Sequence, residues 1–144
     1  MLANTLNGLV VVDTNGVVQL TGTTFKRVQE LIIQVEKPDS PVKFSFNGLV
    51  YMLHNDSGSF NMIAEFRRQT STGANDTLLR SRTINAAGTT FDAVTQPLVF
   101  MLQDTPGQGI WRYYVNIRST ANNMNVQTVT DPYMEAIEYK TNTN

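Results

Sequence analysis

The chain has 144 residues, of which 41% are apolar and 16% are charged, and its formal net charge is -1. It has no cysteine and one histidine, so a disulfide framework, a Cys/His zinc site and a nucleophilic cysteine are excluded. The near-neutral charge argues against a nucleic-acid binder, which needs a basic face. No apolar run approaches the roughly 20 residues of a membrane helix. Because Met1 to Gly8 lack a basic start before an apolar stretch, we expect no secretory signal.

The most frequent residue types indicate strands and turns. The chain contains 18 threonines, 14 valines and 14 asparagines. Threonine and valine favour pleated strands, whereas asparagine favours turns and left-handed backbone. The composition therefore predicts an all-β protein with many exposed loops and little helix.

The first predicted element is a hairpin near the N-terminus. An Asn15-Gly16 pair separates Val10–Val12 from Val17–Leu20. Asparagine and glycine both accept a positive φ, so this pair between two apolar runs predicts a two-residue hairpin turn. We expect residues 1–7 to form a flexible N-terminal arm.

Residues 26–35 fit two periodicities. A helix would gather Val28, Leu31 and Val35 on one face, whereas a strand would alternate Leu31, Ile33 and Val35 with polar residues. The adjacent isoleucines and the β-rich context favour a strand. Two prolines then predict a turn, because proline cannot donate a backbone hydrogen bond.

Alternating apolar and polar residues predict further strands through the middle of the chain. The clearest strands with one solvent-exposed face lie at residues 42–46 and 60–66, and a weaker one lies at residues 77–84. Loops are predicted from composition at residues 54–59, 70–75 and 85–90.

Two segments, Leu49 to Leu53 and Leu98 to Leu102, are apolar on both faces. An outer strand of a monomeric sandwich should have one wet face, so these segments suggest a second burial surface. Contact between subunits explains this pattern, and a central strand covered by loops explains it equally well.

The C-terminal third begins with a tight turn at residues 104–109, followed by a long strand, Ile110 to Ser119. Residues 132–139 stay open between a helix, which Asp131-Pro132 would start, and a strand. Short strands separated by turn signals predict an antiparallel jelly-roll β-sandwich. We expect a single domain over residues 1–144, with a short tail at 141–144.

The C-terminal third also carries a resemblance. The aromatic strand Ile110–Ser119, a polar turn, the short strand Val126–Val129 and the closing segment Met134–Glu138 resemble the last strands of trimeric jelly-roll heads from phage virion proteins, which are C1q/TNF-like. The resemblance implies that the final segment is a strand and that the protein is a homotrimer about the sheet that carries Tyr113 and Tyr114. Together with the chain length it favours a capsid decoration (cement) protein on the virion surface, bound to the major capsid protein.

These expectations select candidate contact residues. The subunit-interface candidates are Leu98, Phe100, Met101, Tyr113, Tyr114 and Tyr51. The capsid-contact candidates are Leu2, Asn4, Leu6, Arg67 and Arg68. The alternative function is a receptor-binding fibre head that holds a host glycan or protein through the loops at residues 54–59 and 70–75.

Nothing in the sequence predicts catalysis or a cofactor. His54 is the only imidazole, and nearby serines in one loop do not make a catalytic triad. Glu135 and Glu138 would fall on opposite faces of a strand, which argues against a catalytic carboxylate pair. No phosphate-binding glycine loop or calcium loop pattern is present. We therefore expect a protein that is not an enzyme, binds no metal or cofactor and has no membrane or nucleic-acid partner.

Overall fold

The computed structural model describes residues 10–12, 17–19, 23–54, 58–88, 93–120 and 124–139. These residues form strands joined by turns, and the described part of the chain contains no helix that is long and apolar enough to cross a membrane. The strands are β1 (Val10–Val12), β2 (Val17–Gln19), β3 (Lys26–Val35), β4 (Val42–His54), β5 (Gly58–Thr70), β6 (Thr77–Gly88), β7 (Ala93–Asp104), β8 (Gly109–Ser119) and β9 (Met124–Glu138).

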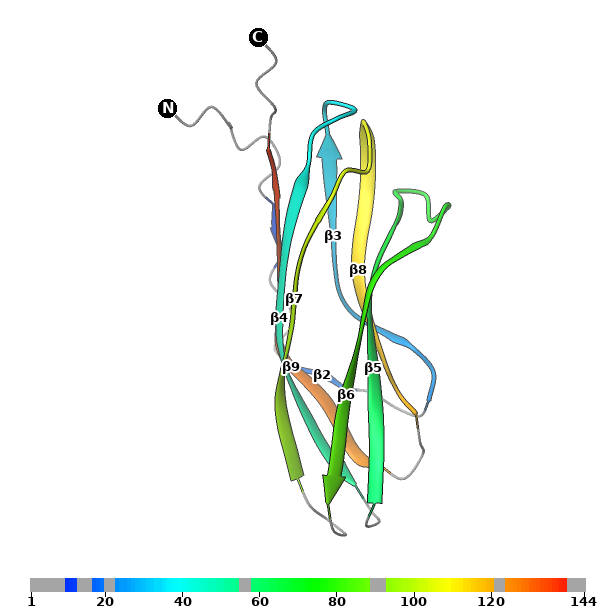
Figure 1. Ribbon diagram of the computed structural model, residues 1–144, viewed down its shortest axis with the longest axis vertical. Coiled ribbons are helices and arrows are strands. Elements are labelled where there is room, and N and C mark those ends of the chain that lie inside the picture. Colours follow the sequence, from blue (N-terminus) through cyan, green and yellow to red (C-terminus); the bar gives the residue numbers. More distant parts are fainter. Residues whose placement is uncertain are drawn as a thin grey trace.

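Two antiparallel sheets face each other along the long axis of the molecule (Figure 1). Sheet A has the order β1-β9-β4-β7, with β2 also paired to β9, and sheet B has the order β3-β8-β5-β6. In chain order every connection from β2 onward crosses between the sheets, except that from β5 to β6, which stays in sheet B. This arrangement confirms the predicted antiparallel jelly-roll β-sandwich.

The core lies between the sheets because alternate side chains of each strand point inward. At its centre the rings of Phe44 and Tyr113 lie 4.0 Å apart, and the ring of Phe66 lies 5.7 Å from that of Phe100. These residues come from both sheets, so their packing joins the layers. Burying a phenylalanine side chain contributes about 1.5–3 kcal/mol, so this aromatic cluster is a main source of stability.

The predicted hairpin at Asn15-Gly16 is wrong. Val10–Val12 pairs with Met134–Ala136, and Val17–Gln19 pairs with Thr128–Thr130, both antiparallel to β9. The two segments therefore run in the same direction along one edge, whereas a hairpin needs opposite directions. The long strand β9 provides pairing for both segments and outweighs the local turn signal. Asn15, Gly16, the arm at residues 1–7 and the tail at 141–144 lie outside the described residues.

Residues 26–35 form a strand, as favoured by the adjacent isoleucines, and they pair with β8. Residues 132–139 belong to β9 up to Glu138, so the helical alternative is wrong there. Asp131 has a φ of 49°, and the β4–β9 register shifts between Asn47 and Leu49. Asp131-Pro132 therefore makes a β-bulge, which accommodates a left-handed residue and a proline that lacks an N–H.

Several loop boundaries also differ from the prediction, and Gly58, Ser59 and Thr70, predicted as loop, belong to β5. β6 continues to Gly88, so residues 85–88, predicted as loop, pair with β5 instead. His54 is the last residue of β4 and pairs with Met124. In each place pairing with a neighbouring strand extends an element beyond what the local composition indicates.

Candidate interaction surfaces

The outer face of sheet A is poor in charge and rich in apolar side chains. Pairing in register places Ser45 beside Met101 and Leu49 beside Pro97, with their side chains on the side away from the core. Leu49 is 44% exposed and Met101 is 68% exposed. The apolar residues of this face are Leu49, Tyr51, Pro97, Val99, Met101, Tyr133 and Ile137.

Two charged residues occupy regularly paired, described positions on this outer face, and both have local partners. The ammonium of Lys43 lies 4.8 Å from the centre of the Tyr139 ring. The carboxylate of Glu135 accepts a hydrogen bond of 2.8 Å from the Tyr133 hydroxyl. The two charges have opposite signs and therefore cancel each other.

The outer face of sheet B is different, because it carries a network of arginines and carboxylates. Arg67 pairs with Glu65 at 2.6 Å and with Asp76 at 3.1 Å. Arg27 pairs with Glu30 at 2.7 Å. Charged side chains of this kind keep a sheet face hydrated, so sheet B presents a polar surface to its surroundings.

Tyr114 lies at the centre of this charged face. Its hydroxyl donates a hydrogen bond of 2.6 Å to Asp76, and the guanidinium of Arg27 lies 3.8 Å from its ring centre. Burial raises the pKa of the Tyr114 hydroxyl, and the hydrogen bond to Asp76 raises it further. Burial alone would also raise the pKa of the Asp76 carboxyl, but hydrogen bonds from Tyr114 and Arg67 hold that pKa below its usual value.

A second polar cluster joins the two sheets. Arg68 on β5 forms an ion pair of 2.6 Å with Asp104 on β7, and the Tyr113 hydroxyl donates a hydrogen bond of 2.8 Å to the same carboxylate oxygen. The guanidinium of Arg68 also lies 5.1 Å from the centre of the Trp111 ring. Burial, the charge of Asp104 and the hydrogen bond to it raise the pKa of the Tyr113 hydroxyl.

The structure corrects four of the six predicted subunit-interface residues. Leu98, Phe100 and Tyr113 are buried between the two sheets of a single subunit. Tyr114 lies on the outer face of sheet B, but Arg27 covers its ring. None of the four has surface left for another subunit, because strand alternation turns three of them inward and an arginine shields the fourth.

The other two interface candidates both lie on the outer face of sheet A, at separate positions along the strands. Met101 is exposed and Tyr51 is partly exposed. They come from the two segments that are apolar on both faces, and these segments lie on neighbouring strands, where Leu49 pairs with Pro97, the residue before Leu98. Val99 and Tyr133 also belong to this face, and the sequence reasoning missed them because it did not reveal which strands are neighbours.

Of the five capsid-contact candidates, the structure describes the two arginines and not the three N-terminal residues. Arg67 is held by two carboxylates on sheet B, and Arg68 takes part in the link between the sheets. Their internal partners explain both arginines without a capsid. Leu2, Asn4 and Leu6 lie outside the described residues.

The carboxylates that were considered for catalysis do not form a pair. Glu135 lies on the outer face of sheet A, whereas Glu138 is buried and accepts a hydrogen bond of 3.1 Å from the backbone N–H of Glu36. No group of three metal-ligating side chains gathers anywhere in the described ranges.

Comparison with known proteins places the fold. No protein-family model matches the chain, and no curated protein matches its sequence. Eiger TNF from S. frugiperda matches 98% of this chain over 91% of its own, with 9% identity and a TM-score of 0.48. Dimeric latent PorU from Porphyromonas gingivalis is matched over 95% of this chain and 13% of its own, with 7% identity and a TM-score of 0.55.

A viral protein is also among the structural neighbours. A chain of infectious bursal disease virus, Gx strain, is matched over 94% of this chain and 37% of its own, with 8% identity and a TM-score of 0.46. This protein therefore spans a small part of PorU and about a third of the viral chain. At 7% identity the similarity to PorU, with its TM-score of 0.55, shows a shared fold alone.

Proposed function

We propose that this protein is a structural virion component, a homotrimeric decoration (cement) protein that docks on the major capsid protein of a phage head and stabilises it. The observation that carries the proposal is the apolar outer face of sheet A, with Leu49 and Met101 exposed on paired strands. The resemblance of the C-terminal strands to trimeric phage virion heads supplies the setting.

A second copy of the chain is the occupant that this face suits. Removing apolar surface from water contributes about 25 cal/mol per Å², and contiguous exposed apolar patches mark interaction sites. The opposite charges of Lys43 and Glu135 already have local partners, so an identical face meets no net repulsion. Copies of one chain usually assemble with closed symmetry, and three around one axis would cover the face in each subunit.

The charged face of sheet B remains available to water and to the capsid surface in such an assembly. A trimer presents every capsid contact three times, so weak contacts add up to an affinity that one copy lacks. This role is structural and involves no catalysis.

The proposal is tested by asking where the protein resides in the virion. Mass spectrometry of purified heads, after the tails have been removed, should detect the protein at a constant copy number. Heads prepared without it should bind the recombinant protein and withstand a higher temperature. Detection in the tail fraction alone would overturn the proposal and support a receptor-binding fibre head, in which the exposed turn after β5 would face the host.

Two matched variants test whether the outer face of sheet A, rather than that of sheet B, forms the trimer. Leu49→Lys charges the outer face of sheet A, and Ile32→Lys charges the outer face of sheet B, and both positions are 44% exposed. If sheet A forms the trimer, Leu49→Lys should abolish head binding, because each copy then has to bind alone. Ile32→Lys should retain the trimer, and equal loss of head binding in both variants would contradict the assignment of sheet A.

A further inference from the structure

The two sheets leave an open side between β6 and β7. In the described pairing, β6 is paired with β5 alone and β7 is paired with β4 alone, so each is the edge strand of its sheet. Figure 1 shows the two strands along the same side of the sandwich. A hollow of about 530 Å³ lies between them. Its lining residues are Arg82, Thr83, Ile84, Asn85, Gln96, Pro97, Leu98 and Val99.

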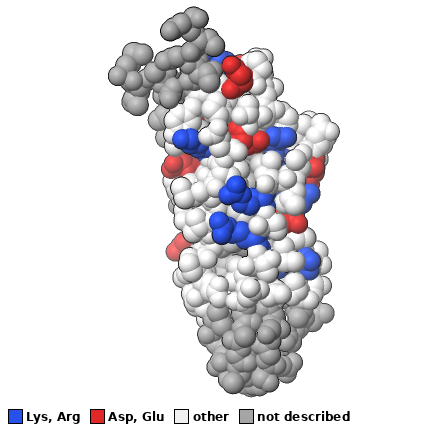
Figure 2. Space-filling model, viewed as in Figure 1, with Lys and Arg blue, Asp and Glu red and all other residues white. Residues whose placement is uncertain are grey.

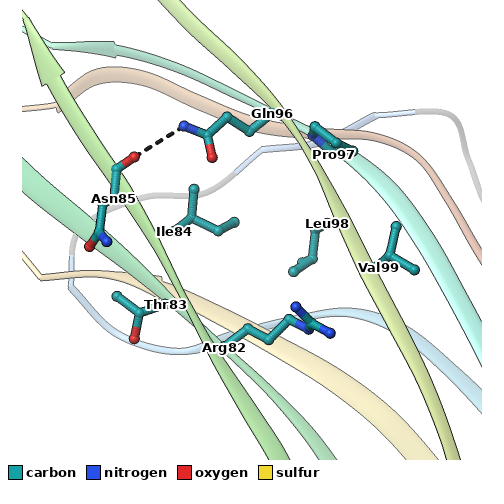
Figure 3. Close-up of a pocket in the computed structure, with 8 residues that line it drawn as sticks. All are labelled: Arg82, Thr83, Ile84, Asn85, Gln96, Pro97, Leu98 and Val99. Atoms are coloured by element: carbon teal, nitrogen blue, oxygen red, sulfur yellow. Dashed lines mark hydrogen bonds between the residues drawn. The ribbon is translucent and has the colours of Figure 1, made fainter.

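Two hydrogen bonds between the sheets border this groove. Arg80 donates to the carbonyl oxygen of Met101 at 3.0 Å on one side. The Gln96 carboxamide donates to the carbonyl oxygen of Asn85 at 3.0 Å on the other side (Figure 3). These bonds hold the two edge strands at a fixed separation, so the groove is preformed.

The groove carries a positive charge without a matching carboxylate. No acidic residue lines it, and no ion pair to Arg82 occurs among the described residues. The guanidinium of Arg82 lies 5.8 Å from the centre of the Phe100 ring. Figure 2 shows Lys and Arg side chains gathered over the middle of this side of the molecule.

We propose that the groove between β6 and β7 binds a saccharide that carries a carboxylate. Arg82 offers a planar pair of N–H donors, which matches the two oxygens of a carboxylate. The oxygen of the Gln96 carboxamide points into the gap and can accept a hydrogen bond from a sugar hydroxyl (Figure 3). Ile84 and Leu98 point toward each other between the strands and supply an apolar floor for the C–H face of a sugar ring (Figure 3).

An extended peptide fits the groove less well, although edge strands often recruit one. The side chains of Arg80 and Gln96 cross the gap, and a peptide strand would have to displace both hydrogen bonds. Charged side chains that point inward from an edge strand also oppose strand addition. Pro97 and Val99 line the groove and also belong to the outer face of sheet A, so the groove adjoins the proposed trimer contact, but it does not depend on a virion role.

The test titrates the full chain with tetragalacturonic acid and follows backbone amide signals by NMR. The acidic saccharide should shift the signals of Thr83, Asn85 and Gln96, whereas its fully methyl-esterified form should bind at least tenfold more weakly. Arg82→Gln should weaken binding about tenfold, because a hydrogen bond to a charged group is lost. The affinity of Arg82→Lys should lie between those of the wild type and Arg82→Gln, since lysine keeps the charge and loses the paired donors.

Controls separate the groove from general charge effects. Arg118→Gln removes the same charge from the outer face of sheet B and should leave the affinity unchanged. Asn85→Ala removes a side chain that points away from the groove and keeps the backbone carbonyl that Gln96 uses, so it should leave the affinity unchanged. Three results would each overturn the proposal: unshifted groove signals, equal affinity of Arg82→Gln and wild type, or tighter binding of tetraglutamate than of the saccharide.

Discussion

The guanidinium of Arg68 on β5 and the carboxylate of Asp104 on β7 are joined by an ion pair of 2.6 Å that links the two sheets. The Tyr113 hydroxyl donates to the same oxygen of Asp104 at 2.8 Å. Both charged side chains are largely buried. If one partner of this pair is removed, the charge of the other therefore stays largely buried without its counter-charge.

Asp104→Asn should destabilise the fold by about 2–3 kcal/mol, because it leaves the Arg68 charge largely buried without its counter-charge. Chemical denaturation at one fixed protein concentration measures this loss. The matched control is Glu30→Gln, which breaks the exposed pair with Arg27 and should cost less than about 1 kcal/mol. Equal losses in the two variants would show that the link between the sheets has no special weight.

Tyr113 makes stability depend on alkaline pH. Burial and the neighbouring Asp104 raise the pKa of its hydroxyl, so the folded chain keeps a proton that the unfolded chain releases above about pH 10. The ionisation of Tyr113 should therefore leave the free energy of unfolding unchanged below that pH and should lower it above that pH. The slope of unfolding free energy against pH should be shallower in Tyr113→Phe by about 1.4 kcal/mol per pH unit. Parallel curves for the two proteins above pH 10 would contradict this assignment.

Gly48 lies opposite the bulge at Asp131-Pro132, where a side chain would be crowded. A Cβ atom at Gly48 would lie 3.0 Å from Cγ1 of Val129 and 3.4 Å from Cζ of Phe46. Gly48→Ala should therefore destabilise the fold by about 1–3 kcal/mol through overpacking.

A double-mutant cycle checks the cause of this loss. Val129→Ala removes the methyl group that the new Cβ would meet, so the double variant should be more stable than the sum of the two single losses predicts. Additive losses would show that crowding against Val129 is not responsible.

The alternation of residues predicted the strands because a half-buried strand has a period of two wherever it lies in the sheet. Ile110–Ser119 and the strand over residues 26–35 follow this rule, and both are found in the structure. The Asn15-Gly16 hairpin failed because its flanking segments pair with β9, which is far away in the sequence. Local turn chemistry cannot reveal such a partner.

The interface residues were predicted only in part for a related reason. Apolar residues on both faces of Leu49–Leu53 and Leu98–Leu102 correctly indicated outward apolar side chains, namely those of Leu49 and Met101. The sequence did not reveal which residue of each segment points outward, so Leu98 and Phe100 were assigned to the surface although they face the core. The groove at Arg82 was missed because two strands of different sheets create it.

Leu49→Lys should convert the protein to a monomer, because it places a charge at the centre of the proposed contact face. Ile32→Lys, at equal exposure on sheet B, should leave the oligomeric state unchanged. Sedimentation velocity of both variants at several concentrations measures the outcome. A monomer in both, or an oligomer in both, would disprove the role of Leu49 in assembly.

Light scattering of the wild-type protein in solution gives its molar mass, which shows whether copies of the chain cover the outer face of sheet A. One chain has a mass of 16.1 kDa. Burial of the outer face of sheet A by identical copies predicts a particle of three times that mass at micromolar concentration. A mass of one chain over the whole concentration range would mean that sheet A stays uncovered, and it would contradict the account.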